Sequence, residues 1–268
     1  MSVHAPASEL LSALIDDPAH SAVLLDVDGT LAPIVRHSDD AMVPAPTRSL
    51  LSAIAKRYAL VACVSGRRAT ETRRIVAIGS IAYIGNHGGE ILPPRGTQVD
   101  IDPELRAWTR RIRDFTRRTD TPELRRLRVR LEDKGAITGF HWRGAPNETE
   151  AEIAVRAIAT DAETDGFATH WGRKVLEVRP PLQFDKGIGV ERLLAGSDVT
   201  HAMYAGDDAT DLDAFRTLAD LAAEGRLQTA VRVGVRSDEG PAEIEHQADL
   251  IVDGPGGVHR LLESLVPA

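Results

Sequence analysis

The sequence predicts a doubly wound α/β core with a mostly parallel sheet, interrupted by a smaller inserted α+β domain. The first observation is a series of short runs rich in Val, Ile, Leu and Ala, which are typical of strands buried on both faces. The second is that helical stretches lie between several of these runs, as in a parallel sheet. The third is a middle segment in which helices and strands follow a different order. We therefore expect residues 1–102 and 181–268 to form the core and residues 103–180 to form the insert.

The core elements follow these runs in chain order. Strands are expected at the apolar runs 22–27, 59–64, 81–84, 202–205, 230–235 and 250–252. Helices are expected between several of them, over residues 46–57, 69–78, 187–194 and 211–223. This alternation indicates the doubly wound core.

The insert has a helix-strand-strand unit that occurs twice. Its expected elements are a helix over 104–118, strands over 127–131 and 136–142, a helix over 148–162, and strands over 167–171 and 174–179. Its borders carry Pro93-Pro94-Arg95-Gly96 and Pro180-Pro181, which are stiff segments suited to hinges between two bodies.

Composition limits the class of partner. The chain has 268 residues with 43% hydrophobic content, enough to bury a large core. Its net charge of −8 argues against a nucleic-acid partner, because phosphate binding needs a basic face. The arginine-rich segment 106–130 is the exception. It could steer an anionic ligand, or it could be a solvated helix face.

The remaining whole-chain features suggest a soluble, cytoplasmic protein without disulfides. Cys63 is the single cysteine and lies in an apolar run, so an inert core role is expected. The N-terminus lacks the basic region and long apolar segment of a secretory signal, and no stretch approaches membrane-spanning length. We expect no membrane partner, and a monomer is favoured.

The segment Asp26-Val27-Asp28-Gly29-Thr30-Leu31 places two carboxylates where a buried strand meets a glycine turn. Such an arrangement can hold a divalent cation and offer a nucleophile together. An EF-hand calcium loop would need glycine at the sixth position and glutamate at the twelfth, where Leu31 and His37 stand. A structural Asp-Gly turn remains the alternative.

Three further motifs end or follow predicted strands: Ser65-Gly66-Arg67, Lys186 with its neighbours, and the acids Asp207, Asp208 and Asp211. Ligands of open parallel sheets bind beyond the carboxyl ends of the strands, so these motifs should converge there. Each residue also has a structural explanation. Ser65 could cap a helix, Lys186 could lie at the surface, and the acids could complement a helix dipole.

Together, the core motifs resemble the signature of the haloacid dehalogenase-like phosphohydrolases, which implies a Rossmann-like core with a cap domain. The fuller set resembles the trehalose-6-phosphate phosphatase family: GNHGGE from Gly85, EDKG from Glu132, HWR from His141, KVLEVRP from Lys174 and GDDATDLDAF from Gly206. The resemblance extends from about Val23 to Phe215. One departure is Leu212, where the family usually has glutamate. This position is not expected to bind metal, so the site is expected to be intact.

By this resemblance, Asp26 is the nucleophile that becomes an aspartyl-phosphate, and Asp28 is the general acid and then the base. Mg²⁺ is the expected cofactor, held by the Asp26 carboxylate, the Asp28 carbonyl and Asp207, with Asp211 as an outer-sphere or alternate ligand. Ser65, Gly66 and Lys186 are expected to bind the phosphoryl oxygens. Lys186 should keep Asp26 ionised, whereas Asp28, crowded by other carboxylates, should be protonated more easily.

The resemblance also implies that the insert recognises the sugar. Glu132, Lys134 and Glu177 are the leading candidates, followed by His141, Arg143 and His87. A surface ion pair is the alternative for Glu132 and Lys134. Core packing is a better explanation than sugar stacking for the tryptophans Trp108, Trp142 and Trp171.

The expected function is therefore Mg²⁺-dependent hydrolysis of trehalose 6-phosphate to trehalose and phosphate. One alternative keeps the chemistry and changes the sugar, to sucrose phosphate or glucosylglycerate phosphate. Another, of a different class, is a catalytically silent regulator that binds a sugar phosphate.

Overall fold

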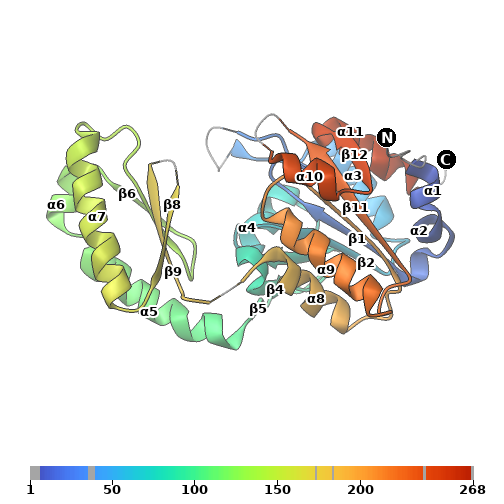
Figure 1. The fold of residues 1–268 in the computed structure, drawn as a ribbon, viewed down its shortest axis with the longest axis horizontal. Helices are drawn as coiled ribbons and strands as arrows, with labels where there is room; N and C mark the ends of the chain where they lie inside the picture. Colours follow the sequence, from blue (N-terminus) through green and yellow to red (C-terminus); the bar gives the residue numbers. More distant parts are fainter. Residues whose placement is uncertain (1–6, 36–39, 173, 183, 238–239, 267–268) are drawn as a thin grey trace. The chain divides into compact units, whose positions relative to one another are not determined.

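The computed structural model describes residues 7–35, 40–172, 174–182, 184–237 and 240–266. The chain divides into two compact units (Figure 1). The core unit comprises Met1–Asp100 and Phe184–Ala268, and the insert unit comprises Ile101–Gln183. The borders expected from the sequence, 103 and 180, fall close to the ends of this second unit.

Within the described residues, the core unit is built on an eight-stranded sheet in the order β12-β11-β10-β1-β2-β3-β4-β5. From β12 to β3 each neighbouring pair is parallel, and β4 runs antiparallel to β3. The six expected core strands are present, and β4 and β5 are short additions at one edge. The strands are β1 (Ser21–Asp26), β2 (Leu60–Val64), β3 (Ala82–Gly85), β4 (Glu90–Leu92), β5 (Asp100–Ile101), β10 (His201–Gly206), β11 (Thr229–Arg236) and β12 (Leu250–Asp253).

Helices cover both faces of this sheet (Figure 1). Val23 and Leu25 of β1 join the apolar cluster formed with α3 (Ala45–Ile54), α4 (Ala69–Val76) and α11 (Gly254–Ser264). Ala22 and Leu24 join the cluster formed with α8 (Lys186–Ala195), α9 (Asp211–Ala223) and α10 (Ala242–Gln247). Because successive side chains of a strand point to opposite faces, the wholly apolar run in β1 serves both clusters.

Shorter helical segments complete the core unit. Before β1 the chain forms α1 (Ala7–Leu10), α2 (Ser12–Asp16) and η1 (Pro18–His20), and η3 (Asn86–Gly88) follows β3. The central position of β1, between β10 and β2, matters most for the site. It brings the carboxyl ends of these three parallel strands side by side, where Asp207, Asp26 and Ser65 lie.

The insert unit has its own antiparallel sheet and its own apolar core. The strand order is β6-β7-β9-β8, and Phe115, Phe140 and Val155 are among the residues buried between sheet and helices. The strands are β6 (Arg130–Asp133), β7 (Thr138–His141), β8 (Ala168–Gly172) and β9 (Val175–Arg179), and the helices are α5 (Pro103–Thr119), α6 (Pro122–Arg126) and α7 (Glu148–Thr164).

One expected strand of the insert begins later than predicted. The sequence predicted a strand over 127–131, and β6 spans Arg130–Asp133, because α6 ends only at Arg126. Thr121 caps α6 by accepting a hydrogen bond from the backbone N–H of Leu124, and Pro122 stands in the first turn, where it needs no hydrogen-bond donor. The remaining expected helices and strands of the insert are present with shifts of a few residues.

In the part of the chain that the structure describes, no helix combines the length and apolar character that crossing a membrane requires.

Candidate active site

Asp26 and Lys186 form a buried ion pair at the carboxyl end of β1. Asp26 is the last residue of β1, and Lys186 is the first residue of α8. The Lys186 ammonium donates to Asp26 Oδ1 at 2.6 Å and to Asp211 Oδ1 at 2.7 Å. Both members of the pair are almost fully buried, at 4% and 3% exposure. The alternative of a surface lysine is therefore wrong for Lys186.

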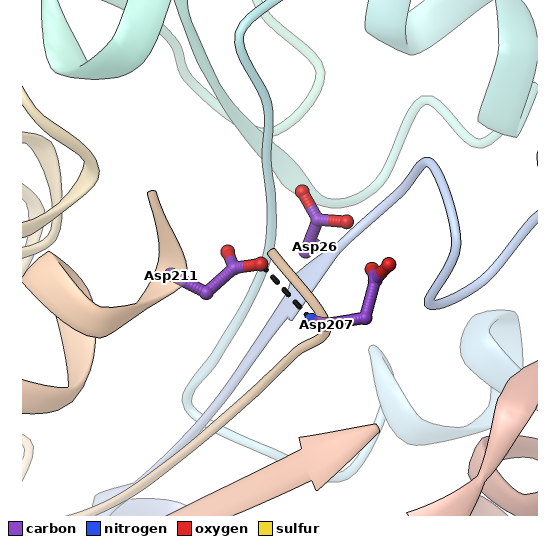
Figure 2. Close-up of side chains that lie close together, drawn as sticks. All are labelled: Asp26, Asp207 and Asp211. Atoms are coloured by element: carbon purple, nitrogen blue, oxygen red, sulfur yellow. Dashed lines mark hydrogen bonds between the residues drawn. The ribbon is translucent and has the colours of Figure 1, made fainter. Parts of the chain in front are cut away.

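Asp207 and Asp211 complete a group of three buried carboxylates with Asp26. One oxygen from each lies within 4.8 Å of the others, and Figure 2 shows the Asp211 carboxylate directed toward the backbone nitrogen of Asp207. Asp211 Oδ2 accepts from the backbone N–H groups of Asp207 and Asp208, at 3.0 and 2.9 Å. Its Oδ1 accepts from Lys186 and from the Tyr204 hydroxyl, the latter at 2.6 Å. Both Asp211 oxygens are thus committed to protein donors, and Asp211 organises the loop that holds Asp207.

Two glycines make this close packing possible. Gly29 has φ +94°, and a Cβ there would lie 2.1 Å from Asp207 Oδ2. At Gly206 a Cβ would lie 2.2 Å from the carboxyl carbon of Asp211. Neither contact is possible for a real side chain, so Gly29 lets the Asp207 carboxylate approach the turn after β1, and Gly206 lets the Asp211 carboxylate approach the end of β10.

The site carries more negative than positive charge. Three ionised carboxylates and one ammonium would leave two net negative charges, three minus one, in a buried place. Burial raises the pKa of Asp26 well above its ordinary value, although the Lys186 ammonium opposes the shift. Burial also raises the pKa of Asp207 to about 6. For Lys186, burial alone would lower the pKa, but the carboxylates of Asp211 and Asp26 outweigh burial and raise it.

This charge distribution fits a divalent cation. Mg²⁺ prefers carboxylate oxygens and retains several waters, so a site with few protein oxygens suits it. The carboxylates of Asp26 and Asp207 are better placed to bind the metal, because both oxygens of Asp211 already accept two hydrogen bonds each. The residues present therefore fit the metal that the sequence predicts.

Asp28 has a partner that the sequence did not predict. Its two oxygens accept from Nε and Nη2 of Arg67, each at 2.8 Å. Arg67 also donates through Nη1 to Glu71 at 2.7 Å. Sequence reasoning missed this contact because Arg67 and Asp28 are far apart in the chain.

Ser65 and Gly66 lie at the carboxyl end of β2, beside His87. The Ser65 hydroxyl oxygen accepts from the Arg67 N–H at 3.1 Å, so it forms a turn and does not cap α4. A Cβ on Gly66 would lie 2.7 Å from the His87 imidazole. His87, which the resemblance grouped with the sugar contacts, thus belongs to the core unit and packs against the expected phosphate-binding turn.

Glu90 is a buried acid whose role the sequence did not reveal. It is 4% exposed and accepts from Asn86 Nδ2 at 2.7 Å and from the backbone N–H of Ala69 at 2.9 Å. Ala69 begins α4, so Glu90 supplies the cap that the residues flanking this helix do not. Glu90 thereby ties the His87 turn to the helix that follows Arg67.

The other sugar-contact candidates lie in the insert unit, and most of them form one polar cluster. Lys134 Nζ is 2.9 Å from Glu177 Oε1 and 3.8 Å from Glu132 Oε2. His141 Nε2 lies 2.7 Å from Glu132 Oε2, and Arg179 also pairs with Glu177. The sequence did not single out Arg179, although it is two residues from Glu177 on one strand.

Arg143 and the tryptophans are the remaining residues of the insert that the sequence analysis considered. Arg143 is exposed in the turn after β7. The Lys174 ammonium, the Gly144 N–H and the charge of Arg143 together lower the pKa of Glu148. Trp108 and Trp142 make edge-on ring contacts, with Phe167 at 5.5 Å and with Trp171 at 6.1 Å. These contacts agree with packing roles for Trp108 and Trp142, whereas Trp171 is exposed, at 39%.

Comparison with known proteins places the chain in a family. The sequence profile of trehalose-phosphatase matches residues 24–254. The chain belongs to the trehalose-phosphatase family. A trehalose-phosphate phosphatase of Mycolicibacterium paratuberculosis is 33% identical over 213 residues, which is 73% of this chain and 51% of that protein. The chain thus spans about half the length of the mycobacterial relatives that it matches.

Solved structures show the same fold. The C-terminal domain of a C. albicans trehalose-6-phosphate phosphatase is similar with a TM-score of 0.72 at 18% identity, and the match covers 99% of this chain and 98% of that one. The C-terminal domain of the Candida albicans trehalose synthase regulatory protein is also similar, with a TM-score of 0.60 at 15% identity, covering 91% of this chain and 92% of that one. These likenesses confirm the predicted α/β core with an inserted domain.

Leu212, the departure from the family pattern, packs among the apolar residues under α9. Its neighbour Asp211 keeps all four hydrogen bonds described above. The exchange therefore leaves the arrangement of the three carboxylates in place.

Proposed function

We propose that this chain is a Mg²⁺-dependent phosphatase that hydrolyses trehalose 6-phosphate to trehalose and inorganic phosphate. The observation on which this proposal rests is the buried group in which Asp26 accepts from Lys186 and lies within 4.8 Å of two further carboxylates. Membership of the trehalose-phosphatase family supports the reaction class and the substrate.

The proposed reaction has two displacements at phosphorus. An Asp26 carboxylate oxygen bonds to phosphorus, the bond from phosphorus to the sugar oxygen breaks, and Asp28 gives that oxygen a proton. Water then attacks the aspartyl-phosphate, Asp28 takes a proton from the water, and phosphate leaves with Asp26 restored. Division into two steps matters because uncatalysed phosphate monoester hydrolysis is so slow that enzymes supply up to about 10²¹-fold acceleration.

The remaining core residues hold the phosphoryl group. Lys186 already donates to Asp26 and would balance charge on the phosphoryl oxygens, and Ser65 with the N–H of Gly66 would donate to the same oxygens. The metal ligands would be the carboxylates of Asp26 and Asp207 and the carbonyl of Asp28. When bound, Mg²⁺ would offset the negative charge that gathers around the phosphoryl group.

Asp28 has to exchange partners in this proposal. In the structure both of its oxygens accept from Arg67, which leaves neither oxygen free to serve the sugar oxygen. Arg67 would thus hold Asp28 near the reacting group until substrate arrives. Glu71 binds the opposite side of the guanidinium and fixes its orientation.

The insert would act as a lid that recognises the sugar and excludes bulk water. Glu132, Glu177 and Lys134 offer carboxylate acceptors and an ammonium donor, which suit the hydroxyl groups of a disaccharide. Their half-buried side chains sit on one face of the sheet, and the helix-covered face supplies the apolar core.

A phosphorylated-sugar panel tests the substrate. We expect kcat/KM for trehalose 6-phosphate to exceed that for sucrose phosphate, glucosylglycerate phosphate and glucose 6-phosphate by about 100-fold or more, because unpaired polar groups penalise the wrong sugar. Equal rates on several sugars would contradict the assignment to trehalose. Phosphate release should stop in EDTA and return with added Mg²⁺; release that persists unchanged in EDTA would contradict the metal assignment.

A catalytically silent regulator is the alternative from another class. The similarity to the regulatory-protein domain shows that this fold is not confined to proteins named as phosphatases. The two functions differ in a simple measurement, since a regulator would bind sugar phosphates without releasing phosphate from any of them. The complete set Asp26, Asp28, Lys186 and Asp207 favours the enzyme.

A further inference from the structure

A glycine lies between the two acidic residues of the insert sheet. Gly139 of the central strand β7 pairs in register with Glu132 of β6 on one side and with Glu177 of β9 on the other. Residues directly opposite one another on neighbouring strands point to the same face. Both carboxylates therefore stand on one face of the sheet, with a position that has no side chain between them.

The His141 imidazole fills this gap. His141 is two residues from Gly139 on β7, so it stands on the same face, and its Nε2 reaches Glu132 Oε2 at 2.7 Å. A Cβ on residue 139 would lie 2.9 Å from that same Nε2 and 3.6 Å from the Glu132 Cβ. The imidazole can therefore bend toward Glu132 only because residue 139 is glycine.

The two acids have different main partners. Burial alone would raise the pKa of Glu177, but Lys134 and Arg179 outweigh burial and lower it to about 2. For Glu132, the hydrogen bond with His141 contributes most to the lowering of the pKa. Lys134 is 3.8 Å from Glu132, well beyond its 2.9 Å contact with Glu177. His141 is thus the main partner of Glu132.

We propose that Gly139 and His141 are positioning residues that set sugar specificity: the gap at Gly139 admits the His141 imidazole, which fixes the Glu132 carboxylate for a sugar hydroxyl. This inference rests on the proposed function, because it assigns an effect to the sugar-recognising surface of the same enzyme. The physical reason is that a carboxylate with one oxygen held by His141 keeps a fixed orientation for an incoming hydroxyl.

The test compares Gly139→Ala, His141→Phe and the double variant. His141→Phe keeps a ring and removes the hydrogen bond to Glu132, and His141→Gln restores a donor. We expect each single variant to raise KM for trehalose 6-phosphate about tenfold, with kcat within about twofold of the parent. The kcat/KM for para-nitrophenyl phosphate should stay the same, because that substrate offers no sugar hydroxyl to Glu132. His141→Gln should recover much of the lost affinity.

Two further comparisons separate positioning from general damage to the sheet. If Gly139 acts through His141, the double variant should be no worse than His141→Phe alone, because the two changes remove the same contact. Gly172→Ala is the matched control: it adds a methyl group to the same sheet, where the nearest atom is a methyl of Val175 at 2.7 Å. This control should leave KM near the parental value.

Several results would overturn the inference. These are additive effects of the two changes, a fall in kcat with unchanged KM, or an equal rise in KM for Gly172→Ala. Binding of trehalose, measured by calorimetry, separates this failure from failure of the proposed function. A parent protein that binds trehalose but releases no phosphate from trehalose 6-phosphate overturns the function alone, and the variants' dissociation constants then decide the inference. A parent that neither binds nor hydrolyses overturns both.

Discussion

At the scale of single residues, the excess of buried negative charge around Asp26 has measurable consequences. The Lys186 ammonium offsets part of this charge, and four hydrogen bonds stabilise the charge of the Asp211 carboxylate. Asp207 accepts only from Thr30 among the bonds described, at 2.9 Å, and its pKa is raised. The metal-free protein should therefore be strained at Asp207.

The first prediction concerns the stability of the metal-free protein. Because the pKa of Asp207 is about 6 in the folded state and about 3.9 when unfolded, the folded state holds the proton more tightly. This contribution to stability is fully present below about pH 4 and is lost as the pH rises through 6. In EDTA at pH 8, Asp207→Asn should thus unfold at a higher temperature than the parent. Its free energy of unfolding should be larger by up to about 2 kcal/mol.

Thermal melts with and without Mg²⁺ check this prediction. Mg²⁺ should stabilise the parent protein and leave the Asp207→Asn variant nearly unchanged. Asp208→Asn is the matched control, because that side chain is exposed and its carboxylate accepts from the backbone of Ala209. A variant at 207 that is less stable than the parent in EDTA at pH 8 would contradict the charge argument.

The second prediction concerns the nucleophile. Asp26→Asn keeps the size of the side chain and an oxygen that can accept from Lys186, so the fold should survive. Turnover should fall by roughly 10⁴-fold or more, because the residue that forms the covalent intermediate is lost. Beryllium fluoride, an analogue of the phosphoryl group, should stabilise the parent protein in Mg²⁺ and not the variant. Full turnover by the variant would refute the covalent mechanism.

At the scale of elements, the start of helix α4 is capped by Glu90, the first residue of strand β4. Glu90 accepts from the N–H of Ala69 at the start of α4 and from the Asn86 amide. Our third prediction is that Glu90→Ala lowers the free energy of unfolding by about 1–3 kcal/mol, because it leaves buried donors unpaired. Glu90→Gln keeps an acceptor oxygen and should cost less. Urea unfolding measures both, and equal stability of the alanine variant and the parent would exclude this capping role.

The sequence predicts the elements best where the pattern is long. Helix α9 begins and ends at the expected residues, 211 and 223, since acids at the start and an apolar face mark it clearly. Strands β4 and β5 contain only three and two residues, too few for any periodicity to stand out. The strand expected over 127–131 begins three residues later, and the short helix α6 before it was not predicted because the Thr-Pro capping signal went unused.

The same limit applies to the site. The motifs place Asp26 and Asp207 together because the parallel strands β1 and β10 end at one edge of the sheet, and this needs only the strand order. Lys186 begins α8 and joins them through its hydrogen bond to Asp26. The bidentate contact of Arg67 with Asp28 and the commitment of both Asp211 oxygens depend on side-chain geometry that no spacing encodes. Gly139 carried no motif at all, and it stands out only through its register with Glu132 and Glu177.

At the scale of the whole molecule, the two units have separate apolar cores. Phe140 is fully buried in the cluster of the insert, and Phe215 is fully buried in a cluster of the core unit. The described clusters share no residues, so each unit should unfold as its own cooperative body.

The fourth prediction uses these two residues as a matched pair. Each truncation to alanine should cost about 3–5 kcal/mol, but within its own unit. Calorimetry of the full chain should show two unfolding transitions. Phe140→Ala should lower the midpoint temperature of one transition, and Phe215→Ala should lower that of the other. If both variants shift a single common transition, the two units unfold together, and the prediction of independent unfolding is wrong.

Independent cores also bear on how such a protein diversifies. Among the described residues, the apolar cluster of the insert contains only residues of the insert unit, so a substitution around Gly139 should leave the packing within the core unit unchanged. Substrate specificity and catalytic chemistry can then evolve at different rates. Descendants of one ancestral hydrolase would change the glycoside that they accept long before they lost phosphatase activity.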